Sequence, residues 1–163
     1  MKLLPALLFC ASLLPADNPA APEQAARGAT FFSQSCATCH SLEGKGTAVG
    51  PDLTRIARVP PRGILVAIRS TVTQYVFLVK PKDGVAFAGI QPEGQSFWWD
   101  LDKLPPEQRP LKPDQIESQQ TNTKWKHPPS KSDYSTRQLA DVVAYIKWVG
   151  YQSRETIDPD SLE

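Results

Sequence analysis

Two cysteines and a histidine lie within five consecutive residues, Cys36-Ala37-Thr38-Cys39-His40. At this spacing, each thiol can add to one vinyl group of a porphyrin, and the adjacent imidazole can turn under the iron as its proximal ligand. The pattern therefore predicts one covalently attached c-type haem, held by Cys36 and Cys39 and ligated by His40.

Two other kinds of site use the same residue types. A redox-active dithiol needs a βαβ context, and nothing upstream of Cys36 indicates a strand. A zinc site could use Cys36, Cys39, His40 and His127. However, Cys39 and His40 are adjacent, whereas structural zinc sites usually separate their ligand pairs by a longer loop. The spacing favours haem over both.

A helix is needed to carry these residues. The segment from Pro22 to Gln34 predicts one, because proline is common at the start of a helix and alanines recur on related turns. Gly28, Phe32 and Cys36 follow at intervals of four and therefore share a helix face. A glycine on that face allows a second helix to approach closely.

The second helix is predicted near the other end of the chain. Ser135 and Gln138 have the spacing of a capping box, and Gly150 follows where a helix would stop. Tyr145 is placed to lie against Gly28. Between these signals runs an apolar stripe made of Leu139, Val142, Val143, Ile146 and Val149.

Three stretches carry a more specific pattern: Gly28-x-x-x-Phe32-x-x-x-Cys36-x-x-Cys39-His40, then Gly50-Pro51-Asp52-Leu53, then Leu139-Ala140-Asp141-Val142-Val143-Ala144-Tyr145-Ile146. This pattern resembles that of a class I cytochrome c. The resemblance implies that the first and last helices cross at Gly28 and the aromatic residue. It also implies that Pro51 offers its carbonyl to the His40 imidazole and fixes the orientation of that ring.

The middle of the chain predicts a small β insert. Residues rich in β-branched and aromatic side chains, separated by turns, follow a short helix that we expect from Pro61 to Ser70. We expect them to form an antiparallel meander over residues 72–101. Its three strands would lie at 72–79, 85–90 and 96–101.

Further segments complete this region. A proline-rich connection from Leu104 to Pro113 leads to a short helix expected near 114–119. We expect Trp98 and Trp99 to fill the seam between the insert and the haem domain. The layout is similar to a subgroup of bacterial haem-binding cytochrome domains. The expected fold is therefore mainly α, with crossing N- and C-terminal helices and a small inserted meander.

The distal side of the iron is where the chain departs from that subgroup. The resemblance implies a methionine followed by proline shortly before the last helix, but the only methionine is Met1. His127-Pro128 stands at the corresponding place, and an imidazole is a good iron ligand. We therefore expect a bis-histidine haem with a lower potential than a methionine-ligated relative. Lys124 and Lys126 are the alternative ligands.

The N-terminus resembles a secretory signal. Lys2 precedes an apolar run that is shorter than the roughly 20 residues of a spanning helix, and a lipid anchor at Cys10 is disfavoured by the bulky residues before it. We expect a leader at 1–21, a cytochrome c domain at 22–151 and a C-terminal tail at 152–163. A leader of this kind predicts a periplasmic or secreted bacterial protein.

Composition says little about partners. The 163 residues contain 18 Lys+Arg and 17 Asp+Glu, without a basic run that would indicate nucleic acid. We expect a periplasmic redox protein or dehydrogenase as partner. Arg55, Arg58 and Arg62 could pair with haem propionates or a partner, although solvated arginines are the commoner case.

Two functional classes follow from these residues. A single haem with both axial positions filled is typical of an electron carrier rather than an enzyme. The alternative, a gas sensor or a peroxidase-like haem protein, would require an open or displaceable distal position.

Overall fold

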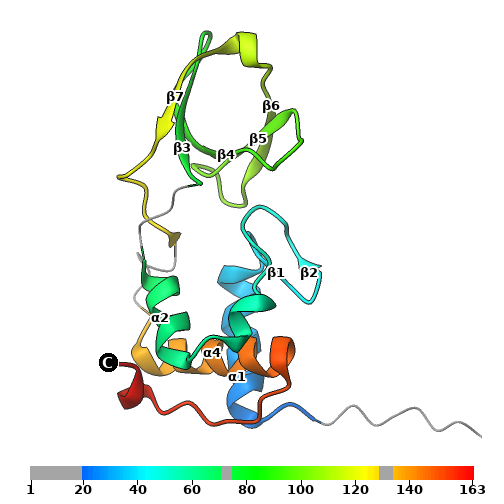
Figure 1. Cartoon of the computed structure of the whole chain (residues 1–163), viewed down its shortest axis with the longest axis vertical. Coiled ribbons are helices and arrows are strands. Elements are labelled where there is room, and N and C mark those ends of the chain that lie inside the picture. The colour runs from blue at the N-terminus through cyan, green and yellow to red at the C-terminus, as the bar shows by residue number, and fades with distance from the viewer. Residues whose placement is uncertain (1–19, 71–74, 129–133) are drawn as a thin grey trace, which may run out of the picture.

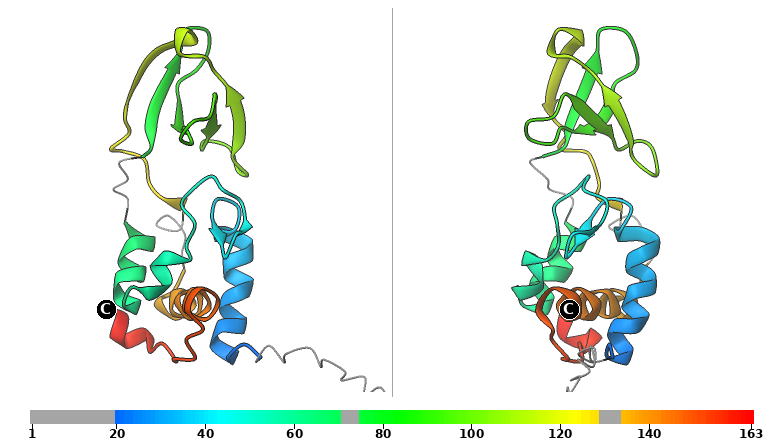
Figure 2. Two further views of the ribbon diagram at one scale, coloured as in Figure 1. Left: turned by 45° about the vertical axis from the view of Figure 1, so that its right-hand side comes forward. Right: turned by 90° about the vertical axis from the view of Figure 1, so that its right-hand side faces the viewer.

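The computed structural model describes residues 20–70, 75–128 and 134–163. Helices gather at one end of the long axis of the molecule, and a five-stranded sheet stands at the other (Figures 1 and 2). No helix within those ranges is long and apolar enough to cross a membrane. Most of the expected leader, including Met1 and Cys10, lies outside them.

Helix α1 (Glu23–Phe31) follows Pro22 and continues directly into a π-helical turn, Phe32–Cys36, that ends at the first cysteine. Helix α2 (Pro61–Arg69) begins at a proline, as its sequence predicts. Helix α4 (Thr136–Tyr151) begins with the expected capping box, in which the Ser135 hydroxyl accepts from the Gln138 N–H. It passes Gly150, where the sequence predicts its end, and stops at Tyr151; the C-cap Gln152 has a left-handed backbone with φ of 56°.

Helices α1 and α4 cross with their backbones in contact at Gly28. A Cβ built on Gly28 would lie 1.9 Å from the Asp141 carbonyl oxygen and 2.9 Å from the Tyr145 Cβ. One helical turn after Gly28, the Phe32 ring packs against the Tyr145 ring, with centroids 5.2 Å apart. Arg27 closes the crossing with two hydrogen bonds to the buried Asp141 carboxylate, at 3.0 and 3.2 Å. The crossing that the sequence predicts is present.

The C-terminal segment is part of the helical core. Ile157 and Leu162 are 2% and 3% exposed and belong to the same apolar cluster as Phe32 and Val143. The Gln24 side chain bonds both backbone groups of Ile157, donating to its carbonyl at 2.9 Å and accepting from its N–H at 2.8 Å. This segment thus joins α1 to the far end of the chain.

The inserted sheet has more strands than the sequence predicts. Its order is β6-β5-β4-β3-β7, and every neighbouring pair is antiparallel. A separate two-stranded hairpin follows the Cys-x-x-Cys-His segment. The strands are β1 (Ser41–Leu42), β2 (Lys45–Gly46), β3 (Phe77–Pro81), β4 (Phe87–Ile90), β5 (Phe97–Asp100), β6 (Glu107–Pro110) and β7 (Ile116–Thr121).

The expectation of a mainly α fold is therefore wrong. Helices account for 38% and strands for 20% of the described residues, and the larger sheet has five strands. The segment expected to be a proline-rich connection contains β6, and the expected helix near 114–119 is a short 3-10 turn, Pro113–Gln115, followed by β7. Both strands are polar, so cross-strand pairing with β5 and β3 decides their conformation rather than local propensity.

Trp98 does not fill the seam between sheet and helices, contrary to expectation. It is 2% exposed and packs with Val79 and Phe87 in a core that belongs to the sheet alone. Trp99 points to the opposite face and contacts Phe97, with ring centroids 5.5 Å apart. The insert therefore has its own apolar core, because its strands alternate large side chains toward one face.

Replacing Gly28 with Ala should destabilise the protein by about 2 kcal/mol or more, because the new methyl group would overlap the Asp141 carbonyl. Helix propensity alone would favour alanine by about 1 kcal/mol. A net loss of stability in the variant would therefore come from the steric clash. Urea unfolding of the full chain measures it. Ala26→Ser, on the exposed face of α1, is the control and should stay within about 0.5 kcal/mol of the wild type. A stabilised Gly28→Ala variant would contradict this crossing.

Candidate functional site

The two cysteines lie at the end of the helical segment that α1 begins. The N–H groups of Cys39 and His40 both donate to the Cys36 carbonyl, at 3.1 and 2.9 Å, which closes the segment into a tight turn. Burial, and then the neighbouring Cys39, raises the pKa of the Cys36 thiol to about 11. Burial also raises the pKa of the Cys39 thiol. Both groups are therefore protonated thiols at neutral pH.

This protonation state argues against the dithiol interpretation. Redox-active Cys-x-x-Cys pairs depend on a thiol pKa that is lowered below its ordinary value, whereas burial raises both here. The zinc interpretation also finds no support. Within the described ranges, no three His, Cys, Asp or Glu side chains come together as a metal site would require. Attachment of a porphyrin remains the chemistry that suits these thiols.

The His40 ring is held by the loop that follows it. Its Nδ1 lies 2.7 Å from the Pro51 carbonyl oxygen, the acceptor that the sequence resemblance implies. Gly50 lies against the ring, because a Cβ there would be 2.6 Å from His40 Cε1. The Gly50 N–H donates to the Cys39 carbonyl at 2.7 Å, so the loop is tied to the turn that carries the ring. Burial lowers the pKa of His40, which favours the neutral imidazole that a metal requires.

Asp52 fixes the far side of this loop. Its carboxylate accepts from the Ser41 hydroxyl at 2.6 Å and from the Thr54 N–H at 2.8 Å. These bonds, that of Ser41 first, lower the pKa of Asp52 to about 2. Since Ser41 follows His40 and Asp52 follows Pro51, the network clamps together the two segments that form the His40–Pro51 bond.

The second histidine approaches from the return linker of the inserted sheet. His127 Nδ1 lies 3.0 Å from the Ile68 carbonyl oxygen, near the end of α2. The Trp125 ring lies beside it, with centroids 6.0 Å apart. Burial is the main cause that lowers the pKa of His127, so this imidazole is also favoured in its neutral form. The chain enters the sheet just after Val76 and leaves it just before Asn122. These two points are joined by a hydrogen bond, in which the Asn122 N–H donates to the Val76 carbonyl at 2.8 Å.

The structure brings the two imidazoles together. The centroids of His40 and His127 are 5.9 Å apart, with an angle of 65° between the ring planes. Two metal–nitrogen bonds of about 2 Å each, plus about 1 Å from each nitrogen to its ring centre, also give about 6 Å. The ring separation therefore fits a haem iron held between them. In each ring Nδ1 bonds a carbonyl, so a metal bond would come from Nε2.

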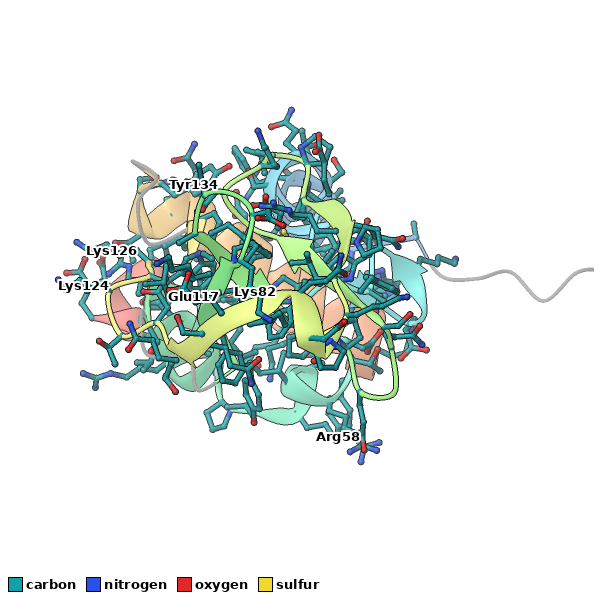
Figure 3. All side chains as sticks on the ribbon, turned by 90° about the horizontal axis from the view of Figure 1, so that it is seen from above. Arg58, Lys82, Glu117, Lys124, Lys126 and Tyr134 are labelled. Atoms are coloured by element: carbon teal, nitrogen blue, oxygen red, sulfur yellow. The ribbon has the colours of Figure 1, made fainter. Side chains whose placement is uncertain are left out.

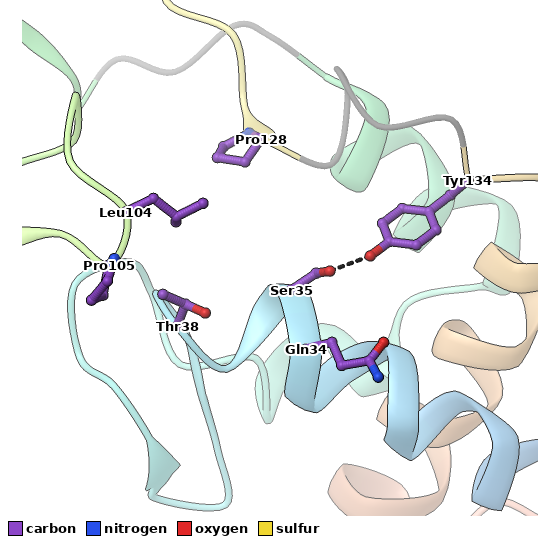
Figure 4. A pocket seen from close by; sticks show the side chains of 7 residues that line it. All are labelled: Gln34, Ser35, Thr38, Leu104, Pro105, Pro128 and Tyr134. Carbon is purple, nitrogen blue, oxygen red and sulfur yellow. Dashed lines mark hydrogen bonds between the residues drawn. The ribbon is translucent and has the colours of Figure 1, made fainter.

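A cavity of about 310 Å³ opens beside the attachment segment. On one side lie Ser35 and Thr38, which flank Cys36 in the chain, and Ser35 is hydrogen-bonded to the Tyr134 hydroxyl (Figure 4). Leu104 and Pro105, from the loop between β5 and β6, also line it. The cavity thus lies between the segment that carries the two cysteines and the loop between β5 and β6.

Other residues singled out in the sequence lie elsewhere. The Arg62 guanidinium donates to the Glu163 carbonyl at 2.8 Å, and the Arg58 guanidinium lies 6.0 Å from the Tyr151 ring centre. Arg55 is an exposed residue of a 3-10 turn, Arg55–Arg58. Lys124 and Lys126 are exposed and lie close together at one side of the molecule, apart from Arg58 in the view of Figure 3.

Sequence reasoning missed three features of this site. The Ile68 carbonyl carries no signal, because any residue at the end of α2 presents one. Asp52 was noted only as part of a motif, although an Asp two residues before Thr54 is typical of a side-chain-capped turn. Leu104 was placed in a connection, and no local pattern indicates that it lines a cavity together with Ser35 and Thr38.

Comparison with known proteins supports one family. A family model described as Cytochrome c matches residues 25–150. No curated protein matches the chain.

Replacing Asp52 with Asn should lower the free energy of unfolding by about 1 kcal/mol at neutral pH, a value reduced because solvent screens this exposed group. The folded-state pKa lies below the ordinary value of 3.8. The stabilisation is therefore fully present above that value and is lost as the pH falls through 3.8 toward about 2. Urea unfolding at pH 7, 4 and 3 should show that the difference in unfolding free energy between wild type and variant becomes smaller as the pH falls.

Glu43→Gln is the matched control, because the Glu43 carboxylate makes no hydrogen bond or ion pair to any residue that the structure describes. Its unfolding free energy should follow that of the wild type at each pH. If the difference in unfolding free energy between wild type and Asp52→Asn stayed constant down to pH 3, the carboxylate would not be what holds the loop.

Proposed function

The chain belongs to the cytochrome c family, whose members bind haem and transfer electrons, and on this premise we propose that it is a mono-haem c-type cytochrome that carries single electrons between redox partners. The observation that carries the proposal is the pair of imidazoles, His40 and His127, at a separation that suits one iron. The partners would be periplasmic redox proteins or a dehydrogenase. Residues 1–21 would direct the chain to that compartment.

Each residue of the site has a distinct task in this proposal. Cys36 and Cys39 would hold the haem through thioether bonds, which their protonated, half-buried thiols form by addition across the vinyl groups. His40 is oriented by the Pro51 carbonyl, which keeps its proton on Nδ1 and directs Nε2 to the metal. A bound haem supplies the one-electron Fe(III)/Fe(II) couple.

His127 would be the sixth ligand. Imidazole donates more strongly to iron than a methionine thioether does and so favours Fe(III), which lowers the reduction potential. The Nδ1–H of His127 donates a hydrogen bond to the Ile68 carbonyl, which makes the other ring nitrogen a stronger donor to a metal. With His40 and His127 holding both axial positions, neither face of a bound iron would be open to a substrate. This supports a carrier rather than a haem enzyme.

Replacing His127 with Ala should convert the oxidised holoprotein from a low-spin to a high-spin or five-coordinate form, because the variant lacks the strong-field distal ligand. Absorption and EPR spectra of the full chain measure this change. His127→Met is the second variant and should stay six-coordinate with a higher potential. Lys124→Ala and Lys126→Ala should leave the spectrum low-spin.

Three results would contradict this proposal. A His127→Ala spectrum that remains low-spin, with a change in Lys124→Ala or Lys126→Ala instead, would assign the ligand to a lysine. Rapid binding of carbon monoxide by the reduced wild type would favour the gas-binding class, since it requires a displaceable distal ligand. Haem that is removed by acidified acetone would exclude covalent attachment.

A further inference from the structure

We propose that the inserted sheet forms one wall of the opening to the haem edge, through Leu104 and Pro105, and so takes part in the surface across which electrons are exchanged with an uncharged, apolar site on a partner. This inference rests on the proposed function. It assigns to the insert a task that neither its sequence nor the family match provides.

The position of the opening follows from the attachment chemistry. Thioether bonds at Cys36 and Cys39 place one edge of the porphyrin against the turn that contains Thr38. Thr38 and Ser35 line the cavity of about 310 Å³, and Pro128, next to His127, lines it from the distal side. The cavity therefore lies along the porphyrin edge nearest the two cysteines, between the proximal and distal sides.

The insert reaches this opening through the loop between β5 and β6. In Figure 4, Leu104 and Pro105 lie at the side of the cavity away from Tyr134, and they line it together with Ser35 and Thr38. Leu104 is 77% exposed. Both the porphyrin edge and a docked protein would bury this side chain.

The sheet holds the loop in place. The Ala88 N–H donates to the Asp102 carboxylate at 3.0 Å, and the Leu101 N–H donates to the Ala88 carbonyl at 2.8 Å. The Asp102 N–H donates to the buried Asp100 carboxylate at 3.0 Å, which also pairs with Arg109. Leu104 thus projects from a loop that is bonded to the central strands of the sheet.

The chemistry of the rim indicates the kind of partner. The residues that line the cavity carry no charge: Gln34, Ser35, Thr38, Leu104, Pro105, Pro128 and Tyr134. A rim of this kind offers apolar contact and neutral hydrogen-bonding groups. It fits a partner whose own redox site is surrounded by uncharged, apolar side chains. A charge introduced on the rim should therefore change electron exchange with a charged probe.

The experiment measures oxidation of the reduced holoprotein by the cobalt(III)–EDTA anion in a stopped-flow instrument. The cobalt complex accepts one electron and becomes cobalt(II), while the haem iron passes from Fe(II) to Fe(III). Leu104→Lys should raise the second-order rate constant about two- to threefold at low salt, and Leu104→Glu should lower it by a similar factor. Both effects should shrink in 0.5 M salt.

Val85→Lys and Val85→Glu are the matched controls. Val85 is 83% exposed and belongs to the segment between β3 and β4. Figure 1 shows that this turn lies at the end of the sheet away from the helices. These variants add the same charges to the same insert but away from the cavity, so their rate constants should stay close to that of the wild type. Equal effects at positions 85 and 104 would overturn the proposal.

A second readout does not depend on electron transfer. Nuclear Overhauser cross-peaks between the Leu104 methyl groups and porphyrin protons should appear in the reduced wild-type holoprotein, while the Val85 methyl groups should show none. If the haem attaches covalently and is low-spin but Leu104 shows no such cross-peaks, this inference fails and the proposed function stands. If no haem attaches, the proposed function fails first.

Discussion

The close crossing of α1 and α4 is the constraint on which the rest of the molecule depends. Gly28 lets the backbones touch, and Arg27 and Asp141 close the contact with an ion pair whose carboxylate is buried. Because α1 runs directly into the turn that ends at Cys36, the crossing sets the position of the attachment segment. Helix α4 also packs against α2, whose end carries the carbonyl that His127 contacts. One helix pair thus positions both sides of the proposed haem.

Each of the two imidazoles is tied to a backbone carbonyl. Pro51 accepts from His40 in a loop braced by Asp52, and Ile68 is bonded to His127 where the chain leaves the helical part. Backbone acceptors fix the tautomer and orientation of a ligand ring without relying on a mobile side chain. The inserted sheet lies in the chain between Ile68 and His127. The proposed distal ligand therefore belongs to the segment by which the chain returns from the sheet to the helices.

Local signals predicted the helices better than the strands. The capping box at Ser135 and the glycine at the crossing depend on residues within one or two turns, and both are present in the structure. β6 and β7 are polar strands that exist because β5 and β3 offer partners, and such pairing has no local signature. For the same reason the overall class was wrong, and Trp98 was assigned to a seam although it fills the core of the sheet.

The sequence by itself determined the chemistry that the chain can offer: the Cys36–His40 spacing, the absence of any methionine besides Met1, and a single further histidine. These are matters of covalent spacing and residue supply, which do not depend on folding. Only the tertiary structure decided that His127 lies 5.9 Å from His40, that Ile68 orients it, and that Leu104 lines a cavity beside the attachment segment. Such contacts join parts of the chain that are far apart. They form only when packing around Gly28 and the sheet repays the entropy of bringing them together.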